Sequence, residues 1–152
     1  MTSRNTDNAP LYGANGGIGL ASSLSGTPVT YGAGGRSTQS GNGGGPNAGT
    51  TPNSGNGGNG VPSGLATGFS GQSGIVIVKG STTQNKIATY TNTGTFTAQS
   101  ATVDYLVVAG GGGGGGSTGG GGGAGGMLYA SANTVTAKTY TILVGGGGSG
   151  GS

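Results

Sequence analysis

The two aspartates decide what acid–base chemistry this chain could perform. Asp7 lies in a polar N-terminal stretch and Asp104 opens an apolar run, and there is no other acidic side chain. Glycoside hydrolysis needs two carboxylates that flank one bond, and nothing in the sequence brings these two together. The chain also has no His and no Cys, which removes the usual transition-metal ligands and the Ser-His-Asp and Cys-His nucleophile systems. We therefore expect no enzyme activity, no catalytic residues, no cofactor and no metal site.

The basic residues are too dispersed to form a binding patch. Nucleic-acid binding needs clustered positive charge, whereas the five Lys and Arg residues are spread along the chain. They are Arg4, Arg36, Lys79, Lys86 and Lys138. No glycine-rich stretch is followed by the Lys-Ser/Thr of a P-loop, and no apolar run approaches the roughly 18 residues of a membrane span. We expect no nucleic-acid partner, no phosphate site and no membrane insertion.

Tyrosine supplies most of the large side chains, with six residues against two Phe and no Trp. An aromatic face can contact a sugar or a receptor, or it can fill a core. Tyr31, Tyr105 and Tyr140 lie in apolar runs, and we expect them to be core residues. Tyr12 and Tyr129 lie in less regular surroundings and are candidates for surface contact.

Short apolar runs bounded by Gly or Ser predict β-strands. The runs are residues 29–31, 75–78, 105–108 and 140–144, and residues 88–97 predict a hairpin with its turn near 92–94. Apolar residues at consecutive positions in 75–78 and 105–108 favour strands that are covered on both faces. No window has the 3.6-residue period of a helix. The residues we expect to pack in these strands are Ile75, Val76, Ile77, Val78, Tyr105, Leu106, Val107, Val108, Tyr140, Ile142 and Val144.

Glycine makes up 43 of the 152 residues, and its arrangement is the most unusual feature of the chain. Residues 110–116 and 119–123 are unbroken glycine runs, and shorter stretches have Gly at every third position, as in Gly68, Gly71 and Gly74. Ordering a residue costs about 1–2 kcal/mol, so such runs are either flexible linkers or ordered by main-chain hydrogen bonds. A polyglycine II helix has three residues per turn and lets neighbouring main chains approach closely. We expect Gly110, Gly113 and Gly116 to pack in this way.

The fold class that follows is all-β with polyglycine II helices, made of short strands and stacked glycine-rich segments, without α-helix. We divide the chain into a polar arm at 1–12, a glycine-rich half at 13–78, a connector at 79–87 and a second glycine-rich half at 88–152.

The strand-and-polyglycine pattern resembles a known family. Residues 105–109 followed by polyglycine, then 123–128 and 139–146, resemble the start of the glycine-rich domains of bacteriophage tail-fibre and related virion proteins. Residues 19–31 and 73–79 resemble the end of the same domain. Some phage adhesins of this broad class stack polyglycine II helices, and the resemblance implies the same packing here.

The order of the halves departs from that family, because the part that normally ends the domain comes first. The chain is therefore circularly permuted relative to the family. The halves can close on each other within one chain, or the second half of one chain can complete the first half of the next, which would build a ring or filament. A third alternative is that the chain is an excised piece.

These observations predict a non-enzymatic structural protein. We expect a self-assembling subunit of an extracellular filament or virion fibre that joins copies head to tail by complementation of half-domains. Its partner would then be another copy of itself. The alternatives are an adhesin that recognises a cell-surface glycan and, more remotely, an ice-binding protein.

Overall fold

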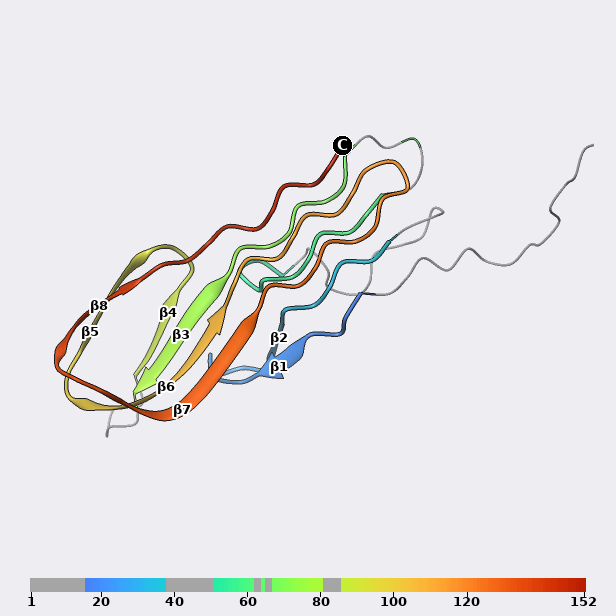
Figure 1. Ribbon diagram of the computed structural model, residues 1–152. Coiled ribbons are helices and arrows are strands. Elements are labelled where there is room, and N and C mark those ends of the chain that lie inside the picture. The colour runs from blue at the N-terminus through green and yellow to red at the C-terminus, as the bar shows by residue number, and fades with distance from the viewer. Residues whose placement is uncertain (1–15, 38–50, 62–63, 65–66, 81–85) are drawn as a thin grey trace, which may run out of the picture.

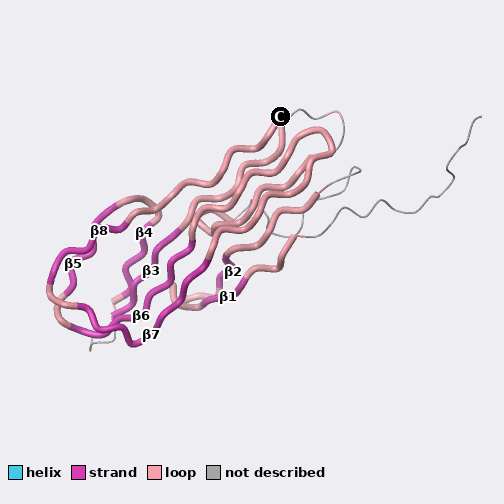
Figure 2. Tube along the Cα trace, in the orientation of Figure 1, coloured by secondary structure: helices cyan, strands magenta, loops and turns pink. Residues whose placement is uncertain are grey.

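The computed structural model describes residues 16–37, 51–61, 64, 67–80 and 86–152. Strands gather at one end of the molecule, and glycine-rich segments run side by side away from them (Figures 1 and 2). The described residues contain no helix, so the all-β prediction is confirmed. The strands are β1 (Leu20–Ser22), β2 (Val29–Tyr31), β3 (Ile75–Gly80), β4 (Ile87–Tyr90), β5 (Gly94–Ala98), β6 (Ala101–Val108), β7 (Met127–Val135) and β8 (Lys138–Ile142).

The central sheet joins the two predicted halves of the chain. Its order is β4-β3-β6-β7, and each neighbouring pair is antiparallel. β3 comes from the first half and pairs with β6 of the second, with Ile77 opposite Leu106. Main-chain hydrogen bonds therefore connect the halves within one chain.

Both faces of this sheet are covered, as the consecutive apolar residues predicted. On one face Ile77 and Leu106 are fully buried in a cluster with Leu24 and Tyr31 from the β1–β2 region. On the other face Val76, Val78 and Val103 are covered by partly buried residues, which include Phe96 on β5 and Ile142 on β8. β1–β2 and β5–β8 are separate two-stranded sheets, so the strand end of the molecule has three layers. Such short ribbons need a packed face to be stable, and the central sheet provides one to each.

The hairpin predicted at residues 88–97 is wrong in its pairing. Both strands exist, but β4 pairs with β3 and β5 pairs with β8. The chain crosses between layers at residues 91–93, and Phe96 then packs on the second face of the central sheet. Its ring centroid lies 6.4 Å from that of Tyr140. Burial across layers therefore outweighed the local turn signal.

A β-bulge interrupts the pairing of β6 with β7. The register shifts between Val103 and Tyr105, and Ala132 on β7 has a φ of 53°, in the left-handed region. The Ala132 N–H donates to Oδ1 of Asp104 at 2.9 Å. Bulges redirect side chains at sheet edges, and here the bulge fixes the direction of the Asp104 carboxylate.

Candidate functional site

The glycine-rich segments form an ordered body, which we call the glycine-rich slab. Figure 2 shows them in pink, the colour of loops, running side by side away from the strands. Its main segments are residues 32–37, 54–61, 67–74, 109–116, 119–126 and 145–151. Main-chain hydrogen bonds connect each segment to its neighbours, so the unusual composition encodes a defined structure.

The segments lie in two staggered rows, and each half of the chain supplies one row. Segments 32–37, 54–61 and 67–74 follow one another in the first row, joined by bonds such as Gly57 N–H to Ala33 C=O at 2.8 Å. The second row has the order 119–126, 109–116 and 145–151. The contact between the rows is therefore also the contact between the halves.

Segment 54–61 lies at the centre of the slab, and its residues are all buried. Gly58 makes bonds to two segments of the other row: its N–H donates to Gly112 C=O at 2.8 Å, and its C=O accepts from Gly122 N–H at 2.7 Å. Some neighbouring segments run antiparallel and others run parallel. Segments 54–61 and 109–116 are parallel, because the N–H groups of Gly58 and Val61 donate in turn to the carbonyls of Gly112 and Gly115. A single segment thus bonds to several neighbours rather than to one or two, as a strand does.

Donors recur at every third residue, which matches the spacing seen in the sequence. The N–H groups of Gly68, Gly71 and Gly74 donate to the carbonyls of Gly151, Gly148 and Gly145 at 2.9, 2.9 and 3.0 Å. A strand would repeat every second residue. The repeat of three is the observation that separates these segments from ordinary strands.

Close approach of main chains explains why glycine is required inside the slab. A Cβ on Gly58 would overlap the carbonyl oxygen of Phe69, and a Cβ on Gly113 would overlap that of Ser149. A Cβ on Gly123 would meet nothing within 4 Å. The same residue type is thus obligatory at one position and replaceable at another a few residues away.

Two buried asparagines bond the slab through their side chains. Asn56 and Asn59 are 1% and 9% exposed. Their Oδ1 atoms accept the N–H groups of Ala33 at 2.8 Å and Arg36 at 3.0 Å. Neither residue was predicted as part of a site, although their three-residue spacing in segment 54–61 is visible in the sequence.

Most of the predicted packing residues lie where layers or rows meet, but Tyr140, which we expected in the core, is only half-buried and lies outside both core clusters. A Cβ on Gly110 or Gly113 would point at the main chain of segment 145–151. The Gly116 carbonyl accepts a hydrogen bond from the Gly119 N–H at 2.8 Å. Val144 packs against the second face of the central sheet, as Ile142 does. The side chain of Tyr129 is 52% exposed, whereas Tyr12 lies outside the described residues.

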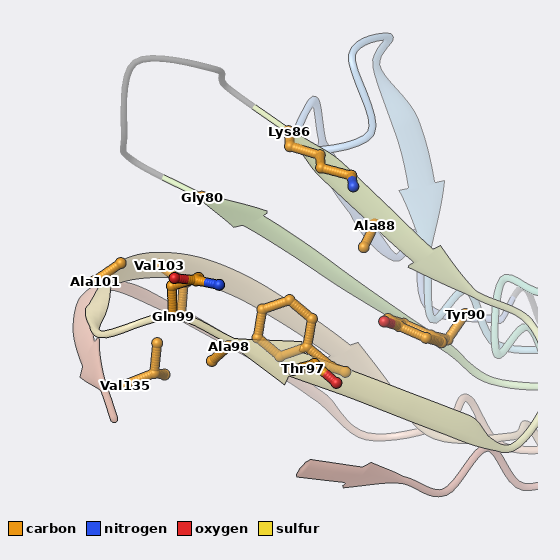
Figure 3. Close-up of a pocket in the computed structure, with 11 residues that line it drawn as sticks. Gly80, Lys86, Ala88, Tyr90, Thr97, Ala98, Gln99, Ala101, Val103 and Val135 are labelled. Atoms are coloured by element: carbon orange, nitrogen blue, oxygen red, sulfur yellow. The ribbon is translucent and has the colours of Figure 1, made fainter. Parts of the chain in front are cut away.

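An apolar cleft of about 370 Å³ lies between the central sheet and the β5–β8 ribbon. Figure 3 shows Ala88 and Tyr90 on β4 facing Thr97 and Ala98 on β5, with Lys86 just before β4. Val103 and Val135 line the cleft from β6 and β7. Its lining is mostly apolar.

Among the described residues, Tyr140 has a clearly perturbed pKa. Its pKa is lowered from the ordinary value of 10.0, mainly by a hydrogen bond from the Thr136 side chain at 3.3 Å. The Thr136 N–H at 3.2 Å and the charge of Lys138 act in the same direction, while desolvation opposes them. The Lys138 Nζ lies 4.7 Å from the ring centroid, so this group is a surface contact around β8.

A polar groove of about 440 Å³ lies between β1 and β7 on the first face of the central sheet. Its lining includes Lys79, Asp104 and Tyr129. Among the described residues no three His, Cys, Asp or Glu side chains are grouped to hold a metal ion. The described part of the chain has no helix that is long and apolar enough to span a membrane.

Comparison with known proteins finds one family. A family described as a glycine-rich domain matches residues 87–152, so this half of the chain is similar to that domain. No curated protein and no solved structure matches the chain.

Proposed function

We propose that this chain is a non-enzymatic structural module, a body segment of an extracellular filament or virion fibre. The observation that carries the proposal is the slab, in which main-chain hydrogen bonds at every third residue join segments from both halves. Each hydrogen bond contributes about 0.5–1.5 kcal/mol net, so a network is needed to offset the entropy of ordering glycine. A stiff body is the expected result.

Polyglycine II is the conformation that we propose for these segments. Its three residues per turn account for the repeat of the donors and for the glycines whose Cβ would overlap a neighbouring carbonyl. The match of residues 87–152 to a glycine-rich domain supports the same interpretation. So does the resemblance of the sequence, in circularly permuted order, to the glycine-rich domains of phage tail fibres.

The assembly route that we propose is exchange of halves between chains. In the structure each half supplies one row, and β3 of one half pairs with β6 of the other. The same contacts can form between the first half of one chain and the second half of the next, which is a head-to-tail arrangement. The closed chain is then the unit before assembly, and its partner is another copy of itself.

Electron microscopy and sedimentation of the purified full chain over a range of concentrations test this function. Filaments or rings that grow with concentration are expected, together with a melting temperature that rises as assembly proceeds. A protein that stays monomeric at every concentration, with a melting temperature independent of concentration, would contradict the assembly proposal. That result would still be consistent with a structural module whose two halves pair within one chain.

A further inference from the structure

We propose that the groove between β1 and β7 is a saccharide-binding site. This inference rests on side chains of the strand end and is independent of the function proposed for the slab. The β1–β2 region covers one face of the central sheet with Leu24 and Tyr31, above Ile77 and Leu106. Beside this cluster the groove combines apolar side chains, which include Leu24 and Met127, with the charged groups of Lys79 and Asp104. A hollow that combines apolar side chains with two charged groups is the first sign of a site.

The groove has an aromatic surface open to solvent. Tyr129 is 52% exposed and Leu20 is 61% exposed, and both line the groove. Met127, two residues before Tyr129 on the same face of β7, packs against the core cluster. The strand that carries the Tyr129 ring is thereby fixed. An exposed aromatic face with an anchored base suits the apolar face of a sugar ring.

Opposite charges line the groove on neighbouring strands. Lys79 on β3 and Asp104 on β6 are direct cross-strand partners, yet no ion pair joins them in the part of the chain that the structure describes. At the bulge, Asp104 Oδ1 instead accepts the Ala132 N–H at 2.9 Å. The groove therefore offers a carboxylate acceptor and an ammonium donor to a ligand.

Sugar hydroxyls match this pair of groups. A hydroxyl both donates and accepts a hydrogen bond, a carboxylate only accepts and an ammonium only donates. Two neighbouring hydroxyls can thus donate to Asp104 and accept from Lys79 while the ring lies against Tyr129. The volume of about 440 Å³ is within the usual range of ligand sites, about 300–1,000 Å³.

Nuclear magnetic resonance titration of the isotope-labelled full chain tests the site. The probes are the methyl glycosides of the common hexoses and N-acetylhexosamines, and short oligosaccharides of the same sugars. Saturable shifts at Lys79, Asp104, Tyr129 and Ala132 are expected with at least one of them. Affinity electrophoresis in gels that contain the matching polysaccharides then distinguishes a free saccharide from a polymer as the source.

Matched variants make the test specific. Tyr129→Ser should weaken binding about tenfold or more, which is typical of a central aromatic contact. Leu128→Ser is the control, because Leu128 is similarly exposed, at 56%, but adjacent strand residues point to opposite faces. Asp104→Asn retains an acceptor for Ala132 and removes the charge, so it should weaken binding without unfolding the bulge.

Three outcomes would overturn the proposal. The first is an absence of shifts at the groove with every saccharide in the panel. The second is equal loss of binding in Leu128→Ser and Tyr129→Ser. The third is saturable binding of free amino acids, whose zwitterion could also satisfy Lys79 and Asp104, with none of any saccharide.

Discussion

The side chain of Asn56 accepts a hydrogen bond from the Ala33 N–H, a role that main-chain carbonyls have elsewhere in the slab. Its Oδ1 accepts the Ala33 N–H at 2.8 Å, and Asn56 is 1% exposed. Neighbouring glycine-rich segments satisfy such donors with backbone carbonyls, as Ala33 C=O does for Gly57 N–H. Between these two segments an uncharged side-chain amide thus adds a hydrogen bond to those made by the main chains.

Replacing Asn56 should destabilise the fold. Asn56→Ala leaves the Ala33 N–H buried without this acceptor, which costs about 1–3 kcal/mol. Denaturant unfolding monitored by circular dichroism measures the change. Asn92→Ala is the control because Asn92 is exposed, and its effect should stay within about 0.5 kcal/mol. Equal effects of the two variants would show that the Asn56 bond contributes nothing.

Two alanine substitutions in the polyglycine region should behave oppositely. Gly113→Ala places a methyl group on the Ser149 carbonyl, and overpacking of this kind typically costs about 1–3 kcal/mol. Gly123→Ala meets nothing within 4 Å and should be neutral or stabilise by up to about 1 kcal/mol. The free energy of unfolding of each variant is the measurement. Flexible linkers would tolerate both substitutions alike.

Amide hydrogen exchange along residues 109–116 should repeat every three residues. The N–H groups that donate to backbone carbonyls in this segment are those of Ala109, Gly111, Gly112, Gly114 and Gly115. Those of Gly110, Gly113 and Gly116 donate to no backbone carbonyl within the described residues. Exchange followed by nuclear magnetic resonance should find these three N–H groups the least protected. Uniformly fast exchange would exclude an ordered slab, and a repeat of two would indicate ordinary strands.

Ile77 should be among the most sensitive core positions. It is 0% exposed and packs with Leu106 between β3 and β6, so Ile77→Ala should cost about 2–5 kcal/mol. Leu143→Ala is the control, because Leu143 is 76% exposed. Thermal and denaturant unfolding of both variants give the comparison. A small effect at Ile77 would mean that the halves are not held together by this sheet.

The pKa of Tyr140 should respond to Thr136. Thr136→Val removes the main cause of the lowered pKa, so ultraviolet titration of the tyrosinate should find Tyr140 ionising closer to 10.0. Thr134→Val, an exposed neighbour on β7, should leave it unchanged. Since the folded pKa is below the unfolded one, this group adds stability as pH rises from the folded pKa towards 10.0 and none at neutral pH. An unchanged pKa in Thr136→Val would contradict the assigned hydrogen bond.

The positions of several strands, though not of β1 and β7, and the repeat of three were predictable because their signals are local. Val29–Tyr31 and Ile75–Gly80 are marked by β-branched residues between glycines, and the glycine register is visible in the sequence itself. The pairing of β4 and β5 was not predictable, since it depends on Phe96 packing across layers.

The groove was only partly predictable. Tyr129 could be singled out because its sequence surroundings are irregular. Lys79 and Asp104 lie far apart in the sequence, and only the pairing of β3 with β6 brings them together. The direction of Asp104 depends further on a bulge with Ala132, which no sequence pattern marks.

Because amides rather than ionised side chains join the segments of the slab, the stability of the slab has no built-in dependence on pH or salt concentration. Peptide groups do not titrate in the range that organisms meet, and dissolved ions do not screen short hydrogen bonds as they screen separated charges. A fibre made of such modules would keep its structure at high salt, at low salt and at low pH with one and the same sequence.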